Sequence, residues 1–544
     1  MAKIETSTVI ITLLLVIAQI GFAYVRSSAA AAQLDITIDS SMVIGENALS
    51  VGYQLDAVAL YAWQSRSTLR DYTRDAGFKL VRVWNNAIEP CSRWYESTKT
   101  GTWRWSEVDS LVKGIIGAGG EPLIVLGFYS WGRNRLMTPE GMATNATTGL
   151  PYPSSWGAYC AEWAKHFKAV GLGVRYYEII NEIFQYWKHD GWPAPQPKLG
   201  YFMDLFNSAA KAMRAASANV RLGNDASMMK GVLDYFISKG EKLDFLSFHA
   251  YGTGSTSTSD SEAFNGAETV GIIETSSNYG VDKARQLYKS KKGLDLPVIE
   301  SEYNLDWTFS SGTDPRIQKM QGALYNALNL RTCMLKGIAY NIYFHFSSSA
   351  SQERRKSTGG YGFGMTNLDN NNRWYPYYVS KMFGANLAVG DKIFMSNSTS
   401  SDVRVVSWNH GGKLNIVLIC KVTEARSVRL QGVTGQLNYT KIDNTISWTT
   451  PKVQTGSIEA TNLITLNGYT VMLLQKNLEP TDSNPSCDVN QDGVLNIIDI
   501  IFVSNAVGSQ PGSLNWDPQA DVNKDNKVNL YDLIVLQNQF RART

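Results

Sequence analysis

The 544-residue sequence predicts an α/β protein with a closed (β/α)8 barrel, a β-sandwich and a small helical module. Three observations predict this architecture. Between residues 46 and 388, short β-rich runs alternate with amphipathic helical segments, as in parallel β/α units. Residues 389–477 instead contain short alternating strands separated by Gly, Asn and Ser. After a polar linker at 478–486, residues 487–544 contain an internal repeat.

The barrel prediction depends on eight strand-like runs. They are residues 50–53, 80–84, 122–126, 174–180, 219–222, 243–248, 296–299 and 337–343. Amphipathic segments between them, such as residues 105–116, 156–170, 202–215 and 317–335, predict helices. Eight strand-helix units in roughly 300 residues match a closed barrel. An open doubly wound sheet is the alternative, but no Gly-rich phosphate loop follows the first strand to favour it.

Two N-terminal segments lie outside the barrel pattern. Residues 33–45 contain a strand-like run for which the barrel has no place left, so we expect it to join the β-sandwich. Residues 1–32 contain an apolar run with Lys3 before it and Arg26 after it, as in an export signal. This run is close to the minimum length of a membrane span, so an uncleaved N-terminal anchor stays open. Both readings predict a secreted or cell-surface protein.

Charge and cysteine content exclude several classes of partner and site. The formal net charge is +3, and Lys and Arg are scattered among 48 acidic residues without a basic patch. Nucleic acid is therefore not an expected partner. The five cysteines are odd in number and lack metal-ligand spacing, which does not support a disulfide framework or a zinc site.

Glu182 and Glu302 are the candidate catalytic residues, because each follows an apolar run that predicts a barrel strand. Catalytic residues of such barrels collect at the C-terminal strand ends. A pair of carboxyl groups facing one another there can act as acid/base and nucleophile of a retaining glycosidase. Glu300 competes with Glu302, because residues two apart on a strand share a face and both are expected to point into the barrel. Glu302 is favoured because it lies closer to the barrel mouth.

A neighbouring glutamate, Glu178, lies deeper on the same predicted strand as Glu182. We expect it to be a buried partner of a basic residue such as Arg82.

The C-terminal repeat predicts two calcium loops, at residues 488–499 and 521–532. Oxygen-bearing side chains recur at loop positions 1, 3, 5, 9 and 12, and position 7 would add a backbone carbonyl. The expected ligands are Asp488, Asn490, Asp492, Val494, Asn496 and Asp499 in the first loop and Asp521, Asn523, Asp525, Lys527, Asn529 and Asp532 in the second.

This repeat resembles a type I-like dockerin, since each loop ends on Asp and is followed by one apolar helix. The resemblance implies that the module binds two Ca²⁺ ions and docks onto a cohesin-containing protein. Asn526 stands where the first loop has Gly, and Asn enters the left-handed region more readily than most residues.

The barrel resembles glycoside hydrolase clan A, most nearly families 39, 5 and 51. Asn181-Glu182 is similar to the clan's fourth-strand pair, and Glu302 to its seventh-strand nucleophile. The resemblance further implies that Asn181, Arg82, His249, Tyr251, Trp84 and Phe344 surround the sugar. The sequence departs from the clan at Ile183, where Pro is usual, and at Phe344, where family 39 often has Trp.

Together these features predict a retaining glycoside hydrolase that cleaves a poly- or oligosaccharide and is tethered through its dockerin. No cofactor is expected for catalysis. The alternative is a non-catalytic carbohydrate-binding or adhesive surface protein on a degenerate barrel. Such a protein would be expected to lose one of the two glutamates, and both are present.

Overall fold

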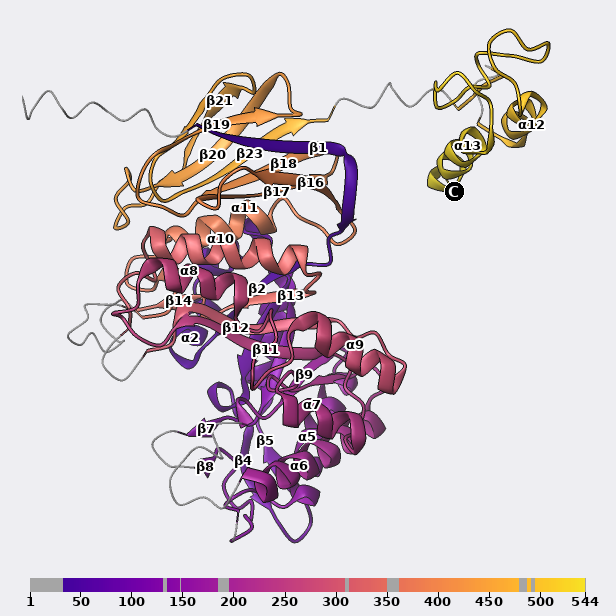
Figure 1. Cartoon of the computed structure of the whole chain (residues 1–544). Helices are drawn as coiled ribbons and strands as arrows, with labels where there is room; N and C mark the ends of the chain where they lie inside the picture. The colour runs from indigo at the N-terminus through magenta and orange to yellow at the C-terminus, as the bar shows by residue number, and fades with distance from the viewer. Residues whose placement is uncertain are drawn as a thin grey trace, which may run out of the picture. The chain divides into compact units, whose positions relative to one another are not determined.

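A computed structural model describes residues 33–130, 135–146, 148–183, 195–308, 313–349, 362–478, 487–490 and 495–543. The chain forms two compact units (Figure 1). The first comprises the chain up to His410 together with Leu414–Lys476, and the second comprises Gly411–Lys413 together with the chain from Asn477 onward.

Eight parallel strands form the barrel sheet of the first unit. They are β2 (Ser50–Leu55), β3 (Leu80–Trp84), β6 (Glu121–Leu126), β9 (Tyr176–Ile179), β10 (Arg221–Gly223), β11 (Leu246–Thr253), β12 (Val298–Asp306) and β13 (Tyr340–Tyr343). Their order is β10-β9-β6-β3-β2-β13-β12-β11. A backbone hydrogen bond from Asp244 N–H to Leu222 C=O (2.8 Å) links β10 to the segment preceding β11. The predicted (β/α)8 barrel is confirmed.

At least one helix follows each barrel strand, and the helices cover the outer face of the sheet (Figure 1). They are α2 (Ala57–Ser65), α3 (Ser67–Asp75), α4 (Ser106–Gly117), α5 (Pro153–Ala169), α6 (Pro195–Ala216), α7 (Lys230–Ser238), α8 (Asp260–Thr269), α9 (Val281–Lys292), α10 (Met320–Leu335) and α11 (Tyr375–Gly384). In α4 the buried residues are Val108, Leu111, Val112 and Ile115, whose spacing places them on one helical face. This periodicity explains why the sequence pattern predicted the helix.

The barrel interior has an apolar floor. Leu80, Leu123, Val125, Phe245, Ile299 and Ile342 form a buried cluster of their own inside the sheet. Arg82 lies two residues after Leu80 on β3, so its side chain points to the same face of the sheet. The layer of side chains above the apolar floor therefore contains a charged group. The interior therefore becomes polar toward the C-terminal strand ends.

Three short two-stranded ladders, which the sequence pattern did not predict, lie in segments that follow barrel strands β3, β6 and β13. They pair β4 (Cys91–Tyr95) with β5 (Thr100–Trp103), β7 (Tyr129–Ser130) with β8 (Arg135–Leu136), and β14 (Ser347–Ser348) with β15 (Thr366–Asn367). They add to the loops on the side of the barrel where the strands end.

Glu300 does not share the barrel interior with Glu302, so the prediction that both point inward is wrong. Its carboxylate accepts hydrogen bonds from Asn329 (3.0 Å) and Cys333 (3.1 Å), both on the surrounding helix α10. The register of β12 against β11 shifts at this point, because Phe248 pairs with Glu300 and the next residue, His249, pairs with Glu302. This bulge breaks the alternation that the sequence argument assumed.

The strands beyond the barrel form one nine-stranded sheet with β1 (Gln33–Glu46). They are β16 (Lys392–Ser398), β17 (Val403–His410), β18 (Lys413–Cys420), β19 (Arg426–Gln431), β20 (Gln436–Asp443), β21 (Gln454–Glu459), β22 (Ile464–Leu466) and β23 (Thr470–Asn477). β1 pairs antiparallel with β16 and parallel with β19, so the strand-like run before the barrel lies within this sheet. Helices α10 and α11 contact the sheet and lie between it and the barrel strands (Figure 1).

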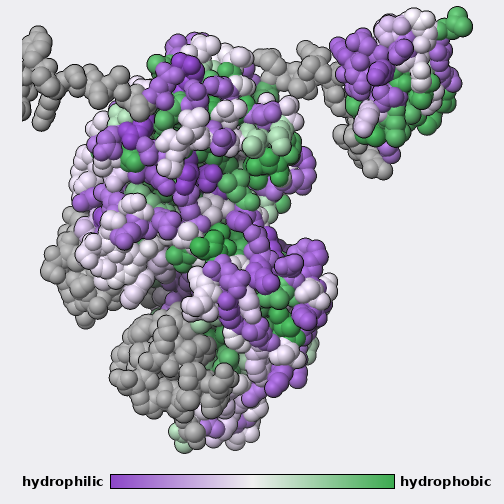
Figure 2. Space-filling view, viewed as in Figure 1, coloured by the Kyte–Doolittle hydropathy of each residue, from purple (hydrophilic) through white to green (hydrophobic). Residues whose placement is uncertain are grey.

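The outer end of β1 is apolar and exposed. Met42, Val43 and Ile44 each expose about half of their surface, and Figure 2 shows apolar side chains gathered at this edge. No helix among the described residues is long and apolar enough to span a bilayer, and the apolar run of residues 1–32 lies outside the described residues.

Replacing Glu300 with Ala tests its placement against the helix layer. We expect Glu300→Ala to lower the free energy of unfolding by about 1–3 kcal/mol, because the Asn329 and Asn341 amides lose a buried acceptor. Urea unfolding measures this change. The exposed Glu459 on β21 provides a control, and equal stability of the Glu300→Ala and Glu459→Ala variants would contradict the placement.

Candidate active site

Arg82, fully buried on β3, lies at the centre of a polar cluster at the C-terminal end of the barrel. Its Nε donates to Glu178 Oε2 (2.8 Å), its Nη1 to Glu302 Oε2 (2.8 Å) and its Nη2 to Asn181 Oδ1 (2.7 Å). The contact with Glu178 agrees with the buried ion pair expected from the sequence. Because each donor has its own acceptor, the guanidinium fixes two carboxylates and an amide relative to one another.

Glu302 is held through both carboxylate oxygens. Arg82 occupies Oε2, and the Tyr251 hydroxyl donates to Oε1 (2.5 Å). Burial and the negative charge of Glu302 raise the pKa of Tyr251 well above its usual value, so the hydroxyl keeps the proton that it donates. The carboxylate is therefore held in one orientation, and Glu302 is only 5% exposed.

Glu182 reaches the same place through an irregular turn. Strand β9 ends at Ile179, and both Ile180 (φ 65°) and Glu182 (φ 48°) adopt the left-handed region. This conformation is strained for a β-branched residue such as Ile180. Contacts from the end of β10 hold the turn, because Asp225 Oδ2 accepts from the Glu182 N–H (2.7 Å) and Asn224 Nδ2 donates to the Ile179 carbonyl (2.8 Å).

The two candidate carboxylates face each other at short range. One carboxylate oxygen of Glu182, one of Glu302 and one ring nitrogen of His249 all lie within 4.8 Å of one another. Such a triad has the donor types of a metal site. However, both oxygens of Glu302 already accept hydrogen bonds, and a cation there would face the guanidinium of Arg82. The arrangement is better suited to proton and group transfer than to metal binding.

His249 lies between these acids. Its Nδ1 is 3.0 Å from Glu182 Oε1, and its Nε2 is 3.3 Å from Asp225 Oδ2. Burial alone would lower the pKa of His249, but the carboxylates of Glu302 and Asp225 and the hydrogen bond with Glu182 raise it to about 9. The imidazole is therefore a cation at neutral pH, and it offsets part of the negative charge around it.

Aromatic side chains line the site next to Glu302. The Trp84 ring lies 5.7 Å from that of Phe344, which in turn lies 6.4 Å from the ring of Tyr251. Trp84 also packs against Phe128 at 4.5 Å. Trp84 and Phe344 are both partly exposed, so their faces are available to a flat apolar group placed beside the carboxylates.

The structure thus brings together all eight candidate residues of the barrel: Glu182, Glu302, Asn181, Arg82, His249, Tyr251, Trp84 and Phe344.

Sequence reasoning missed two neighbours of these residues. Gln54 accepts from Arg82 Nη1 (2.5 Å), and the buried Asp225 contacts Glu182 and His249. Burial raises the pKa of Asp225 to about 7, although the His249 charge opposes the rise. Both follow predicted strands, and that position could have indicated them.

In the second unit, backbone N–H groups of the loop from Asp521 to Asp532 donate hydrogen bonds to the carboxylates of its first and last residues. Asp521 Oδ2 accepts from the Asn526 N–H (2.8 Å). The two oxygens of Asp532 accept from the N–H groups of Asn523 (3.0 Å) and Asn529 (2.8 Å). Asn526 has φ 64°, the left-handed conformation for which Gly is usual at this turn.

The first loop repeats this geometry where it is described. The oxygens of Asp499 accept from the N–H groups of Asn490 (3.4 Å) and Asn496 (2.8 Å), as those of Asp532 do in the second loop. Asp492 and Val494 lie outside the described residues. Helices α12 (Ile497–Ala506) and α13 (Leu530–Arg543) follow the loops. The donor set contains only oxygen and fits Ca²⁺, a hard cation.

The charge on His249 predicts a pH-dependent stability. Its folded pKa of about 9 lies above the unfolded value of about 6.5, so its contribution is complete below pH 6.5 and is lost as the pH rises through 9. We expect the difference in unfolding free energy between wild type and His249→Gln to shrink over that window. Urea unfolding at several pH values measures it, and a difference independent of pH would contradict the charged pair.

Comparison with known proteins finds similarity for both units. Residues 486–541 match the model of the dockerin type I domain. At the sequence level, no curated protein matches the chain.

Solved structures with a similar fold include a GH39 β-xylosidase from Caulobacter crescentus, at TM-score 0.56 and 18% identity, covering 82% of this chain and 99% of that one. A GH39 enzyme from Xanthomonas axonopodis pv. citri has TM-score 0.57 and 16% identity, covering 83% and 98%. A GH30 endoxylanase from Clostridium papyrosolvens C71 has TM-score 0.51 and 16% identity, covering 81% and 100%. The first unit therefore shares its fold with these glycoside hydrolases, and residues 486–541 form a dockerin-like module.

Proposed function

We propose that the chain is a retaining glycoside hydrolase acting on a poly- or oligosaccharide. The observation that carries the proposal is the short gap between Glu182 and Glu302, whose carboxylate oxygens approach within 4.8 Å. Retaining enzymes hold their two carboxyl groups about 5–5.5 Å apart, whereas inverting enzymes leave about 6.5–9.5 Å for a water molecule. The gap therefore favours attack by a carboxylate on the sugar.

Glu302 is the proposed nucleophile and Glu182 the proposed acid/base. Arg82 and Tyr251 orient Glu302 through separate oxygens, while Glu182 is more exposed and has His249 at 3.0 Å. In the first step Glu182 gives its proton to the leaving oxygen as that bond breaks, and Glu302 forms an ester bond to the anomeric carbon.

In the second step Glu182 takes a proton from water, the water oxygen bonds to the anomeric carbon, and the ester bond to Glu302 breaks. His249, as a cation beside Glu182, would stabilise the carboxylate that exists between the two steps. Asn181, held by Arg82, is placed to hydrogen-bond a sugar hydroxyl next to the reacting carbon.

The substrate is proposed to lie against the aromatic side chains of Trp84 and Phe344, whose faces are partly exposed beside Glu302. Similar structures include enzymes named as a β-xylosidase and an endoxylanase. Aryl β-xylosides and xylans are therefore the first substrates to screen. A purely adhesive role would not require two carboxylates held this close.

Removing either carboxylate separates the two roles. We expect Glu302→Ala to reduce kcat by roughly 10⁴- to 10⁶-fold, because no covalent intermediate can form. Glu182→Ala is expected to lose roughly 10²- to 10⁴-fold, and azide should restore activity by attacking the intermediate in place of activated water. Aryl glycoside hydrolysis measures both changes.

Proton NMR of the first product released from wild type identifies the anomer and thus the stereochemical course. Full activity in either variant, or an inverted product, would contradict the assignment.

The C-terminal unit is proposed to bind two Ca²⁺ ions and a cohesin-containing protein, and the enzyme is proposed to act outside the cell or at its surface. Exposed apolar residues recur at equivalent positions of both helices: Ile497, Ile498 and Ile501 on α12, and Leu530, Tyr531 and Ile534 on α13. Figure 2 shows apolar side chains on the surface of this unit. Such residues support a docking role, since contiguous exposed apolar surface commonly marks protein interfaces.

Calcium binding can be measured on the full chain by isothermal titration. We expect two ions per chain for wild type and none for the double variant Asp488→Ala/Asp521→Ala, because each change removes the first carboxylate of a loop. Asp517→Ala, outside both loops, serves as the control. An unchanged stoichiometry in the double variant would contradict the predicted sites.

A further inference from the structure

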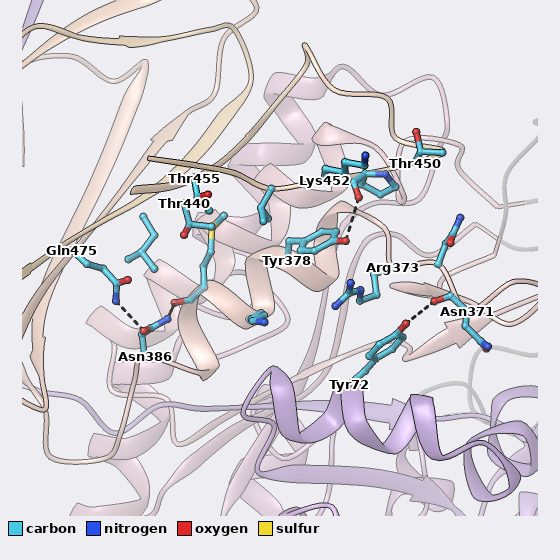
Figure 3. A pocket seen from close by; sticks show the side chains of 16 residues that line it. Tyr72, Asn371, Arg373, Tyr378, Asn386, Thr440, Thr450, Lys452, Thr455 and Gln475 are labelled. Carbon is cyan, nitrogen blue, oxygen red and sulfur yellow. Dashed lines mark hydrogen bonds between the residues drawn. The ribbon is translucent and has the colours of Figure 1, made fainter. Parts of the chain in front are cut away.

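A groove of about 820 Å³ lies on the first unit between α11 and the nine-stranded sheet, apart from the candidate active site (Figure 3). It is lined by residues of α3, of α11 and the segments on either side of it, of strands β20, β21 and β23, and of the connection between β20 and β21. None of its sixteen lining residues belongs to the candidate active site. Its volume falls within the range of small-molecule sites in proteins.

Arg373 is fixed at one end of this groove. Its guanidinium lies 4.8 Å from the ring centre of Tyr72 and 5.3 Å from that of Tyr378. Both tyrosines are anchored, because Tyr72 donates to the Asn371 carbonyl (3.0 Å) and Tyr378 to the Pro451 carbonyl (3.2 Å). A guanidinium held in this way loses little conformational freedom on binding, so it is a preorganised donor for an anion.

The groove is positively charged. Arg373, Lys381 and Lys452 line it, and none of the lining residues is acidic. The neighbouring Asp75 pairs with Lys381 (2.6 Å) and lies 3.7 Å from Arg373, so it offsets only part of this charge. Lys452 is exposed and has no ion pair with any residue that the structure describes. The excess cations favour a ligand that carries a negative charge.

The remaining lining is rich in amides and hydroxyls. Gln475 donates hydrogen bonds to Asn386 (2.9 Å) and to Asn415 (2.8 Å). These bonds fix the side-chain amides of Gln475 and Asn386, which line the groove on the side of the sheet. Thr440 and Thr455 add hydroxyl groups there (Figure 3). Groups that both donate and accept hydrogen bonds suit a ligand with many hydroxyls.

We propose that this groove is a non-catalytic binding site for a carboxylate-bearing saccharide, such as a uronic-acid residue of a polysaccharide. The excess positive charge of the groove would attract the carboxylate, with Arg373 offering two parallel N–H donors and Lys452 a single charged donor. The amides and threonines would bind sugar hydroxyls. The choice of a saccharide rests on the proposed function, whereas the preference for an anion rests on the groove alone.

The test uses the full chain with Glu302→Gln, so that bound saccharide is not turned over. Isothermal titration compares a glucuronate-substituted xylo-oligosaccharide with the same backbone lacking glucuronate, and with inorganic phosphate. We expect the acidic oligosaccharide to bind more tightly than the other two. Lys452→Gln should weaken its binding about three- to tenfold, and Lys381→Gln/Lys452→Gln further.

Lys113, exposed on α4 away from the groove, supplies the matched control, and Lys113→Gln should leave the affinity unchanged. Circular dichroism and thermal unfolding verify that each variant is folded. The affinity gap between the acidic and neutral probes should also narrow as salt is added, because exposed charges are screened.

Equal affinity for the acidic and neutral oligosaccharides would overturn the inference, and so would unchanged affinity in both lysine variants. Phosphate binding as tight as that of the acidic oligosaccharide would show a general anion site and also overturn it. These outcomes are independent of catalysis. If wild type hydrolyses no glycoside, the proposed function fails while the binding comparison still tests the groove.

Discussion

The structure of the barrel mouth depends on one buried cation, Arg82. A charge out of contact with water is costly unless it is paired and hydrogen-bonded. Here the compensating groups come from other strands, with Gln54 on β2, Glu178 on β9 and Glu302 on β12. The register of these strands must bring each of these side chains to the level of the guanidinium. The same interaction that neutralises Arg82 therefore sets the relative positions of the groups proposed to act on substrate.

Regular strand geometry alone would not bring the carboxylates of Glu182 and Glu302 close together. On β12, one extra residue lies between Glu300 and Glu302, which pair with the consecutive residues Phe248 and His249 of β11. This bulge turns Glu302 into the barrel and leaves Glu300 facing α10. On β9, two left-handed residues after the strand carry Glu182 back toward His249. Backbone irregularities of this kind occur where a side chain must be aimed, and surrounding contacts must hold them.

The sequence pattern predicted the barrel because its strands are short apolar runs bounded by turn residues, which local composition reveals. Glu182 and Glu302 could be singled out because each ends such a run. The side to which Glu300 points could not be predicted, because the bulge depends on pairing with β11, which is distant in sequence. Asp225 follows a strand of only three residues and has no motif around it. The groove beside α11 is lined by Tyr72, Arg373 and Lys452, which no local sequence pattern connects.

The first described strand of the chain has a consequence for biosynthesis. β1 lies between β16 and β19, with Ile36 opposite both Ser398 and Leu430. At synthesis rates of roughly 5–20 residues per second, the ribosome needs roughly 20 to 70 s to make these partners after β1 has emerged. During that interval the buried side chains of Leu34, Ile36 and Ile38 have no sheet to cover them. The barrel can fold around its own helices meanwhile, but the N-terminal strand is integrated only after most of the chain has been translated.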